Sequence, residues 1–325
     1  MQQVTALHAI SEKDLPFRAK LLQRIARAWP FHRGRSFFIR NFQRLIEELP
    51  PFVLTRIKGL AKSIAIPRND STGLVLILYG EHDAHIGFHE RYLLNIACDI
   101  AIAQPELTVL DVGANLGSFA LVIATRCGKR CIAFEPQPDL AALLHKNATE
   151  RLGIDSVEVR PYGLSNVSGT IGFERGPQNS GDARININSS DSSITIHRLD
   201  QVFSPDDWKD VCLMKIDVET HEPEVLEGAQ KLWEHHRPPL IFEVLPHELA
   251  KQGKSCKEIG KFLRSNGYKN FMAIDRFLYP PELGVGYISN ILAWGDRLPL
   301  PDIESRVHLR LPKYLSHTPL TPINF

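Results

Sequence analysis

Residues 107–117 read Leu-Thr-Val-Leu-Asp-Val-Gly-Ala-Asn-Leu-Gly, and this stretch decides the fold. Its apolar start is typical of a buried parallel strand. A glycine-rich turn follows at 113–117, and the apolar segment 118–124 after it predicts a helix. A strand, a tight glycine turn and a helix bring a ligand close to the backbone and to a helix N-terminus. The sequence therefore predicts a ligand-binding loop in an α/β fold.

The charge at the end of this strand indicates the kind of ligand. Asp111 stands two residues before Gly113, where a pyrophosphate would meet a carboxylate. The dinucleotide fingerprint is G-x-G-x-x-G, whereas Gly113 and Gly117 are spaced G-x-x-x-G. S-adenosylmethionine, with a sulfonium and an amino group, suits the acid better. We therefore favour a methyl-donor site, and keep a dinucleotide site and a turn that binds nothing as alternatives.

A second strand, predicted at 131–134, supplies the other half of this site. It ends at Glu135, 24 residues after Asp111. In doubly wound folds an acid at this place accepts hydrogen bonds from ribose hydroxyls. Pro136 follows and lacks a backbone donor, so it helps to end the strand pairing.

Composition sets outer limits on the protein. The chain has 325 residues, 43% hydrophobic and 23% charged, which fits one large α/β domain with extensions or two smaller domains. A net charge of +1 gives no sign of a nucleic-acid partner. The five cysteines form no pair of metal-binding motifs, and no secretory signal or spanning segment is visible, so we expect a cytoplasmic protein.

The N-terminal part differs in charge from the rest. Residues 1–60 hold 11 Lys and Arg against 4 Asp and Glu, a local net charge of +7. Within 17–49, seven arginines are interspersed with aromatic residues. We expect a mainly helical extension that packs its aromatic residues on the domain and leaves its arginines in water. Peripheral contact with an anionic membrane or a phosphorylated carrier is the alternative.

The remaining chain alternates strands and helices, which predicts a mostly parallel, doubly wound sheet. Further strands are expected at 73–80, 170–174 and 194–199, the last two around a long polar loop at 176–193. The expected core strands are 107–112, 131–134, 157–161, 211–216, 240–244, 268–274 and 291–294, with helices at 91–103, 118–127, 140–152, 222–235 and 256–265.

Acids also end the fourth and fifth predicted core strands. Asp217 follows the fourth strand and Glu243 closes the fifth. Ligands of open α/β sheets bind beyond the carboxyl ends of the strands, so we expect Asp217 to face the methyl group of the donor. Glu219 and Glu222 begin the next helix, where the helix dipole alone accounts for acids. A divalent metal between Asp217, Glu219 and Glu243 is the minority alternative, and no metal is assigned.

Five stretches together resemble the FkbM family of S-adenosylmethionine-dependent methyltransferases: 109–117, 133–136, 214–222, 225–229 and 240–243. The resemblance covers roughly residues 74–295. It implies a class I methyltransferase fold, Rossmann-like, with seven strands of which the last is antiparallel. It also implies O-methylation of a hydroxyl on a sugar, glycolipid or other secondary metabolite. A non-catalytic module of this fold and a nicotinamide-dependent oxidoreductase remain as rival functions.

Charge and composition, together with the resemblance, give a domain plan and a set of expected site residues. The plan is a basic helical extension at 1–70, the methyltransferase domain at 71–298 and a proline-rich tail at 299–325. Thr220 departs from the family, which usually has glycine at this position. The residues expected to bind the donor are Asp111, Gly113, Ala114, Asn115, Gly117, Glu135, Pro136 and Asp217.

Methyl transfer to a hydroxyl also requires that a proton leave the acceptor. A positioned base contributes roughly 10²- to 10⁴-fold to such a step. Histidine has a suitable pKa near neutrality, which favours His221 and His89. His89 lies in a segment, 87–90, that resembles the G-x-x-E motif of the family, and 179–181 resembles an asparagine–glycine loop. The expected catalytic residues are Asp217, Glu219, His221, Glu243 and His89.

Overall fold

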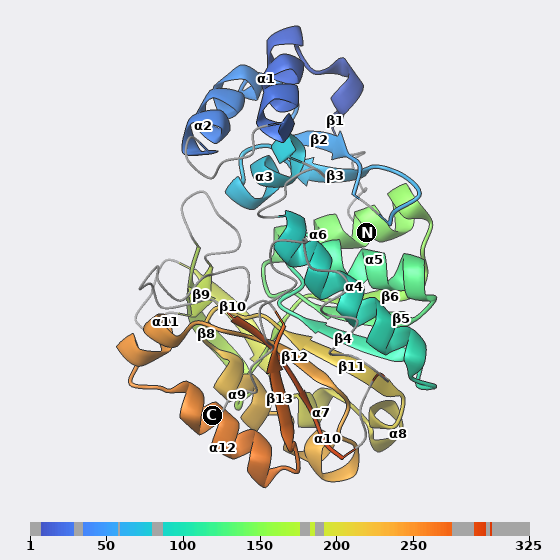
Figure 1. The fold of residues 1–325 in the computed structure, drawn as a ribbon, viewed down its shortest axis with the longest axis vertical. Helices are drawn as coiled ribbons and strands as arrows, with labels where there is room; N and C mark the ends of the chain where they lie inside the picture. Colours follow the sequence, from blue (N-terminus) through green and yellow to red (C-terminus); the bar gives the residue numbers. More distant parts are fainter. Residues whose placement is uncertain are drawn as a thin grey trace, which may run out of the picture.

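The computed structural model describes residues 8–28, 35–57, 59–79, 87–175, 183–185, 192–274, 289–296 and 300. The predicted loop at 179–181 and the tail beyond residue 300 lie outside these residues. The described chain forms a seven-stranded sheet between helices, a unit at the N-terminus with three strands, and a small four-stranded sheet (Figure 1).

The central sheet confirms all seven predicted core strands to within a few residues. Its order is β13-β14-β12-β11-β4-β5-β6, and β14 runs antiparallel to both of its neighbours. Every residue of β4 and β11 is buried, because helices cover both faces of a parallel sheet. The strands are β4 (Thr108–Val112), β5 (Arg130–Phe134), β6 (Val157–Arg160), β11 (Val211–Ile216), β12 (Leu240–Val244), β13 (Asn270–Ala273) and β14 (Ser289–Trp294).

Along β4, successive residues belong to opposite cores, since strand side chains alternate between faces. Val109 packs in the cluster shared with α5, α6 and the N-terminal unit, whereas Leu110 packs in the cluster shared with α9, α10 and α12. The helices are α4 (Gly87–Ala103), α5 (Ser118–Cys127), α6 (Pro138–Lys146), the π-helical turn η3 (Asn147–Leu152), α7 (Leu199–Val202), α8 (Pro205–Trp208), α9 (Glu222–Glu227), α10 (Gln230–His235), α11 (Pro246–Lys251) and α12 (Cys256–Ser265).

One predicted helix is divided in two. The sequence predicts a single helix at 222–235, but α9 ends at Glu227 and α10 begins at Gln230. Gly228 lies so close to the backbone of Ser165 that a Cβ atom there would collide with the Ser165 carbonyl oxygen. The close approach of the segment around Ser165 explains the break in the helix. A single sequence does not reveal this contact.

The unit at the N-terminus contains two departures from the predictions. The strand expected at 73–80 is wrong, because the structure has a helix, α3 (Ser71–Tyr79). A short apolar run fits a buried helix as well as a strand, and here the Asp70 side chain accepts a hydrogen bond from the Gly73 N–H at 2.9 Å, as a helix cap does. The N-terminal extension is mainly helical as expected, but it also contains a three-stranded sheet. Its elements are β1 (Ala9–Ser11), η1 (Glu12–Asp14), α1 (Phe17–Ala28), α2 (Arg35–Ile46), β2 (Phe52–Thr55) and β3 (Ile64–Pro67).

Buried polar contacts fix this unit internally and to the sheet domain. Gln23 Nε2 of α1 donates to the Ile77 carbonyl of α3 at 2.6 Å. Asn147 of η3 accepts from the Ala65 N–H of β3 at 2.8 Å and donates to the Ala65 carbonyl at 3.0 Å. Phe42 is fully buried in the core that continues into the sheet domain. The extension is therefore an integral layer of the fold.

The four-stranded sheet confirms the two further strands expected before β11. It has the order β7-β10-β8-β9 and carries its own small apolar cluster. The strands are β7 (Gly163–Leu164), β8 (Gly169–Glu174), β9 (Arg184–Ile185) and β10 (Ser193–His197).

Candidate active site

Four acids meet at the carboxyl edge of the central sheet, as the sequence predicts. Asp111 lies in β4, Glu135 follows β5, Asp217 follows β11 and Glu243 lies in β12. The Asp217 N–H donates to the Val112 carbonyl at 3.0 Å, which joins the ends of β4 and β11. This edge, at the switch point of the sheet, is where open α/β folds bind ligands.

The glycine turn after β4 has the geometry of a ligand-binding loop. Gly113 and Gly117 have φ of 81° and 83°, and Asn115 has φ of 49°. A Cβ atom at Gly113 would collide with the Asp217 carbonyl oxygen, and one at Gly117 would collide with the Leu144 side chain. Both positions therefore require glycine. Ala114 is buried between them.

Glu135 holds this loop from the neighbouring strand. Its Oε2 accepts from the Asn115 N–H and its Oε1 from the Gln137 N–H, both at 2.8 Å, across Pro136. Burial raises the pKa of Glu135 to about 7, although these two hydrogen bonds oppose the shift. A carboxylate oxygen has more than one acceptor site, so each oxygen keeps room for a ribose hydroxyl.

Lys215 is a central residue of the site that the sequence analysis missed. The register pairs Lys215 of β11 with Asp111 of β4. Its Nζ lies 3.0 Å from Asp217 Oδ2 and 3.5 Å from Asp111 Oδ1. Burial alone would lower the pKa of Lys215, but Asp217 and Asp111 reverse the effect and raise it. The signal in the sequence is a single lysine inside an otherwise apolar strand.

Asp111 faces Lys215 inside the protein. Its side chain is fully buried, and burial raises its pKa while the Lys215 ammonium opposes the shift. Among the described residues, the Lys215 ammonium lies 3.5 Å from the Asp111 carboxylate, below the donor loop.

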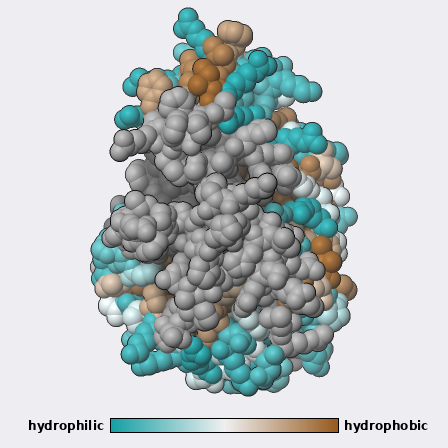
Figure 2. Space-filling model, in the orientation of Figure 1, coloured by the Kyte–Doolittle hydropathy of each residue, from teal (hydrophilic) through white to brown (hydrophobic). Residues whose placement is uncertain are grey.

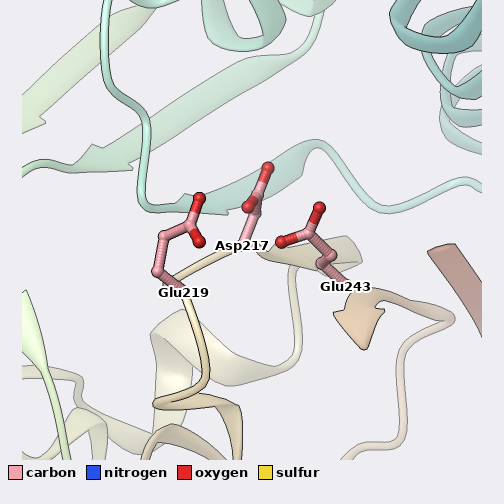
Figure 3. A group of neighbouring side chains, drawn as sticks. All are labelled: Asp217, Glu219 and Glu243. Carbon is pink, nitrogen blue, oxygen red and sulfur yellow. The ribbon is translucent and has the colours of Figure 1, made fainter. Parts of the chain in front are cut away.

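Asp217, Glu219 and Glu243 form the acidic trio of the site. One oxygen from each carboxylate lies within 4.8 Å of the others. Figure 3 shows Glu219 and Glu243 on either side of Asp217, with the Glu243 carboxylate directed toward it. Burial raises the pKa of Glu243 well above its ordinary value, and the charges of Asp217 and Glu219 add to the shift.

The turn that carries Glu219 has a strained backbone. Glu219 and Thr220 have φ of 53° and 80°, a region that β-branched residues rarely adopt. The Gln252 amide donates to Thr220 Oγ1 at 2.5 Å, and Glu222 Oε1 accepts from the Val218 N–H at 3.0 Å. The glycine that the family usually has here would fit this backbone without strain. His221, the next residue, is the N-cap of α9.

The structure describes the side chain of only one of the two candidate histidines, His221. His221 Nε2 lies 2.9 Å from Ser165 Oγ, and its Nδ1 lies 3.4 Å from Glu224 Oε2. Burial lowers the pKa of His221 to about 4. Both ring nitrogens are thus engaged by protein groups other than the acidic trio. The backbone of His89 lies in the first turn of α4, and its side chain lies outside the described part of the structure.

The sequence of the chain is similar to those of known methyltransferases. Residues 111–269 match the family model of the methyltransferase FkbM domain. The chain is 34% identical, over 179 residues, to the hexuronic acid methyltransferase AglP of Haloferax volcanii, and the match covers 54% of this chain and 67% of AglP. The chain belongs to the FkbM methyltransferase family. It is a methyltransferase with a class I fold, and its methyl donor is S-adenosylmethionine.

Solved structures show more distant similarity. The FkbM methyltransferase of Methylobacillus flagellatus is 14% identical, with a TM-score of 0.39, over 69% of this chain and 54% of that one. The magnesium protoporphyrin IX methyltransferase ChlM of Synechocystis, with bound SAM, is 16% identical, with a TM-score of 0.39, over 65% of this chain and 82% of that one. Within the described residues, no helix is both long and apolar enough to cross a bilayer.

Proposed function

We propose that the protein transfers the methyl group of S-adenosylmethionine to a hydroxyl of a sugar, free or within a glycan or glycolipid. The similarity to AglP, a methyltransferase named for a hexuronic acid, carries the choice of acceptor class. The acidic trio supports it, because carboxylates on the acceptor side of the donor loop are suited to hold hydroxyl groups.

The donor loop and Glu135 bind and orient the donor. The glycine turn at 113–117 lies along the donor, and Glu135, which already accepts from the Asn115 N–H, also accepts hydrogen bonds from the ribose. The bound donor supplies a methyl carbon already activated by its sulfonium. Alignment is therefore the main task of the protein, and orientation contributes some ~7–11 kcal/mol to such reactions.

The acidic trio prepares the acceptor. Asp217, fixed by Lys215 at 3.0 Å, holds the acceptor hydroxyl in line with the methyl carbon. One carboxylate of the trio takes the hydroxyl proton as the new carbon–oxygen bond forms, because a positioned base speeds such a step. His221 serves as a positioning residue for the start of α9 through Ser165 and Glu224.

Ligand binding separates this function from its rivals. In a thermal-shift experiment on the full chain, we expect S-adenosylhomocysteine to raise the melting temperature and NAD to leave it unchanged, because only a ligand of the folded state stabilises it. A shift with NAD would favour the oxidoreductase, and no shift with either ligand would favour a non-catalytic module. Transfer of labelled methyl from the donor to a panel of neutral and uronic sugars then identifies the acceptor class.

A further inference from the structure

We propose that Asp217, Glu219 and Glu243 bind one divalent cation of the Mg²⁺ or Mn²⁺ class, which holds the oxygen atoms of the acceptor. The proposal deepens the function proposed above, on which it rests for the acceptor.

The positions of the three carboxylates suit such an ion. One oxygen of each lies within 4.8 Å of the others, and the three come from two segments, the turn after β11 and the end of β12. In an octahedral site with bonds of about 2.1 Å, ligand oxygens are about 3 Å apart in cis and about 4 Å apart in trans. Small rotations of the side chains would bring the trio to these separations. Carboxylate oxygens are also the ligands that these hard cations prefer.

A second observation concerns the buried carboxylate of Glu243. The Oε2 atom of Glu243 is buried and has no hydrogen-bond partner among the described residues. Its carboxylate is directed toward Asp217 (Figure 3). A buried carboxylate oxygen without a donor is costly, and such groups in native proteins call for an explanation. A cation between Glu243 and Asp217 supplies one.

The charge balance of the edge agrees with this. The single ammonium of Lys215 is shared between Asp217 and Asp111, at 3.0 Å and 3.5 Å. Two more carboxylates, Glu219 and Glu243, stand beside Asp217. A sugar acceptor that carried a carboxylate of its own would be repelled by this edge. A divalent cation with three protein ligands keeps open positions for two acceptor oxygens, so it converts a repulsive edge into a binding site.

Metal binding can be measured without knowing the acceptor. The full chain, stripped with EDTA and dialysed, is titrated with Mn²⁺ by calorimetry, and bound Mn²⁺ is counted by electron paramagnetic resonance. We expect one site per chain. Asp217→Asn and Glu243→Gln should each weaken Mn²⁺ binding at least 10-fold. Asp206→Asn, at a side chain that is 98% exposed on α8, is the matched control and should bind like the wild type.

The controls keep the result decisive. Melting temperature and affinity for S-adenosylhomocysteine are measured on every variant, so a failure to fold is recognised, and Glu219→Gln then serves as a third ligand variant. If the wild type binds S-adenosylhomocysteine but takes up no Mn²⁺ at millimolar concentration, the metal proposal is overturned while the methyltransferase function stands. Equal Mn²⁺ binding by wild type and Glu243→Gln also overturns it. Loss of S-adenosylhomocysteine binding in the wild type would instead contradict the proposed function.

An independent observation concerns α1. Phe17, Leu21 and Ile25 are 76%, 46% and 44% exposed. Their spacing of four residues places them on one face of the helix, away from the buried Ala19 and Gln23. Neighbouring apolar side chains that are exposed to water mark an interaction site. Figure 2 shows hydrophobic surface among hydrophilic residues at the end of the molecule that α1 and α2 occupy.

The charges around this stripe identify the partner. Arg18 and Arg24 of α1 and Arg40 and Arg44 of α2 are exposed. Residues 1–60 hold 11 Lys and Arg against 4 Asp and Glu. Apolar side chains between arginines fit the headgroup region of an anionic bilayer, where each basic residue contributes about 1 kcal/mol. We infer that α1 and α2 dock the enzyme on an anionic membrane surface.

Flotation with vesicles tests the surface. The wild type should float with vesicles of phosphatidylcholine and phosphatidylglycerol, should not float with phosphatidylcholine alone, and should be released by 0.5 M salt. Phe17→Ser/Leu21→Ser should reduce flotation at least 10-fold, whereas Ile102→Ser, at a 60% exposed residue of α4, is the matched control. No flotation of the wild type with anionic vesicles, or equal flotation of the double variant, would overturn the inference.

Discussion

The carboxyl edge of the central sheet and the outer face of α1 are built in opposite ways. At the edge, Asp111, Glu135 and Lys215 are buried among the strand ends. On α1, Phe17 and Leu21 are exposed to water. Folding alone favours neither arrangement, because charges lose solvation inside a protein and apolar groups gain nothing outside it.

The difference between the two regions lies in how their polar groups are satisfied. At the edge, burial raises the pKa values of Glu135 and Glu222 to about 7, so folding works against their charged forms. At the N-terminal unit, the buried amides of Gln23 in α1 and of Asn147 in the adjoining η3 bond backbone groups of the unit. The edge therefore holds charge for a ligand, whereas the N-terminal unit uses its buried polarity for stability and reserves its outer face for contact.

The largest expected effect is on turnover, from a substitution of Asp217 at the carboxyl edge. Asp217→Asn keeps the shape of the side chain and removes its charge. We expect turnover to fall by about 10²-fold or more, with donor affinity nearly unchanged, because the interaction acts mainly in the transition state. Labelled methyl transfer and calorimetry with S-adenosylhomocysteine measure the two quantities. A variant that turned over at the wild-type rate would remove Asp217 from the chemical step, and the base would have to be sought at His89.

A second substitution tests whether a buried carboxylate at the edge lowers the stability of the folded protein. The pKa of Glu222 is about 7, raised by burial from 4.5. The folded state therefore favours the protonated form of Glu222. The loss of folding free energy caused by its ionisation is absent below pH 4.5 and grows as the pH rises to 7. Glu222→Gln keeps the bond to Val218 and removes this cost. We expect the variant to be more stable than the wild type by on the order of 3 kcal/mol at pH 8 and equally stable at pH 4.

Denaturant titration at the two pH values checks this result. The difference between variant and wild type removes the contribution of His221, whose pKa is lowered to about 4 by burial and which acts in the opposite direction. A gain that is the same at both pH values would show that packing, rather than charge, is responsible.

The donor half of the edge is tested by Glu135→Ala. The substitution removes the acceptor for the ribose and for the Asn115 N–H. Donor affinity should fall by about 1.5–3 kcal/mol, the range for hydrogen bonds to charged groups. Calorimetry with S-adenosylhomocysteine measures it, and a folded variant with wild-type affinity would remove Glu135 from the donor site.

The smallest effect concerns the N-terminal unit. Asn147→Ala leaves the N–H and carbonyl of Ala65 without their buried partner. We expect a loss of about 1–3 kcal/mol in unfolding free energy, with donor affinity intact. Urea titration checks the first and calorimetry the second. A weaker donor affinity would show that the N-terminal unit also shapes the edge, which would weaken the contrast drawn above.

The sequence predicts what depends on short stretches of chain and misses what depends on contacts between distant ones. The core strands are coded by short apolar stretches, and the structure confirms them. Asp217 and Glu243 follow from the same local pattern, because each stands at the carboxyl end of a parallel strand, and the structure brings them together. The break at Gly228 depends on Ser165, 63 residues away, and α3 depends on packing under α1. Lys215 becomes a site residue only through its register with Asp111.

Gly113 has a consequence for motion. Its Cα atom lies against the Asp217 carbonyl with no space for a further carbon, and the Asp217 N–H is bonded to Val112. The donor loop and the acceptor side are thus a single mechanical part, so a ligand that stiffens one stiffens the other. Occupation of the donor site alone should slow amide hydrogen exchange at Asp217. Any opening that admits the acceptor must then come from segments other than these two loops.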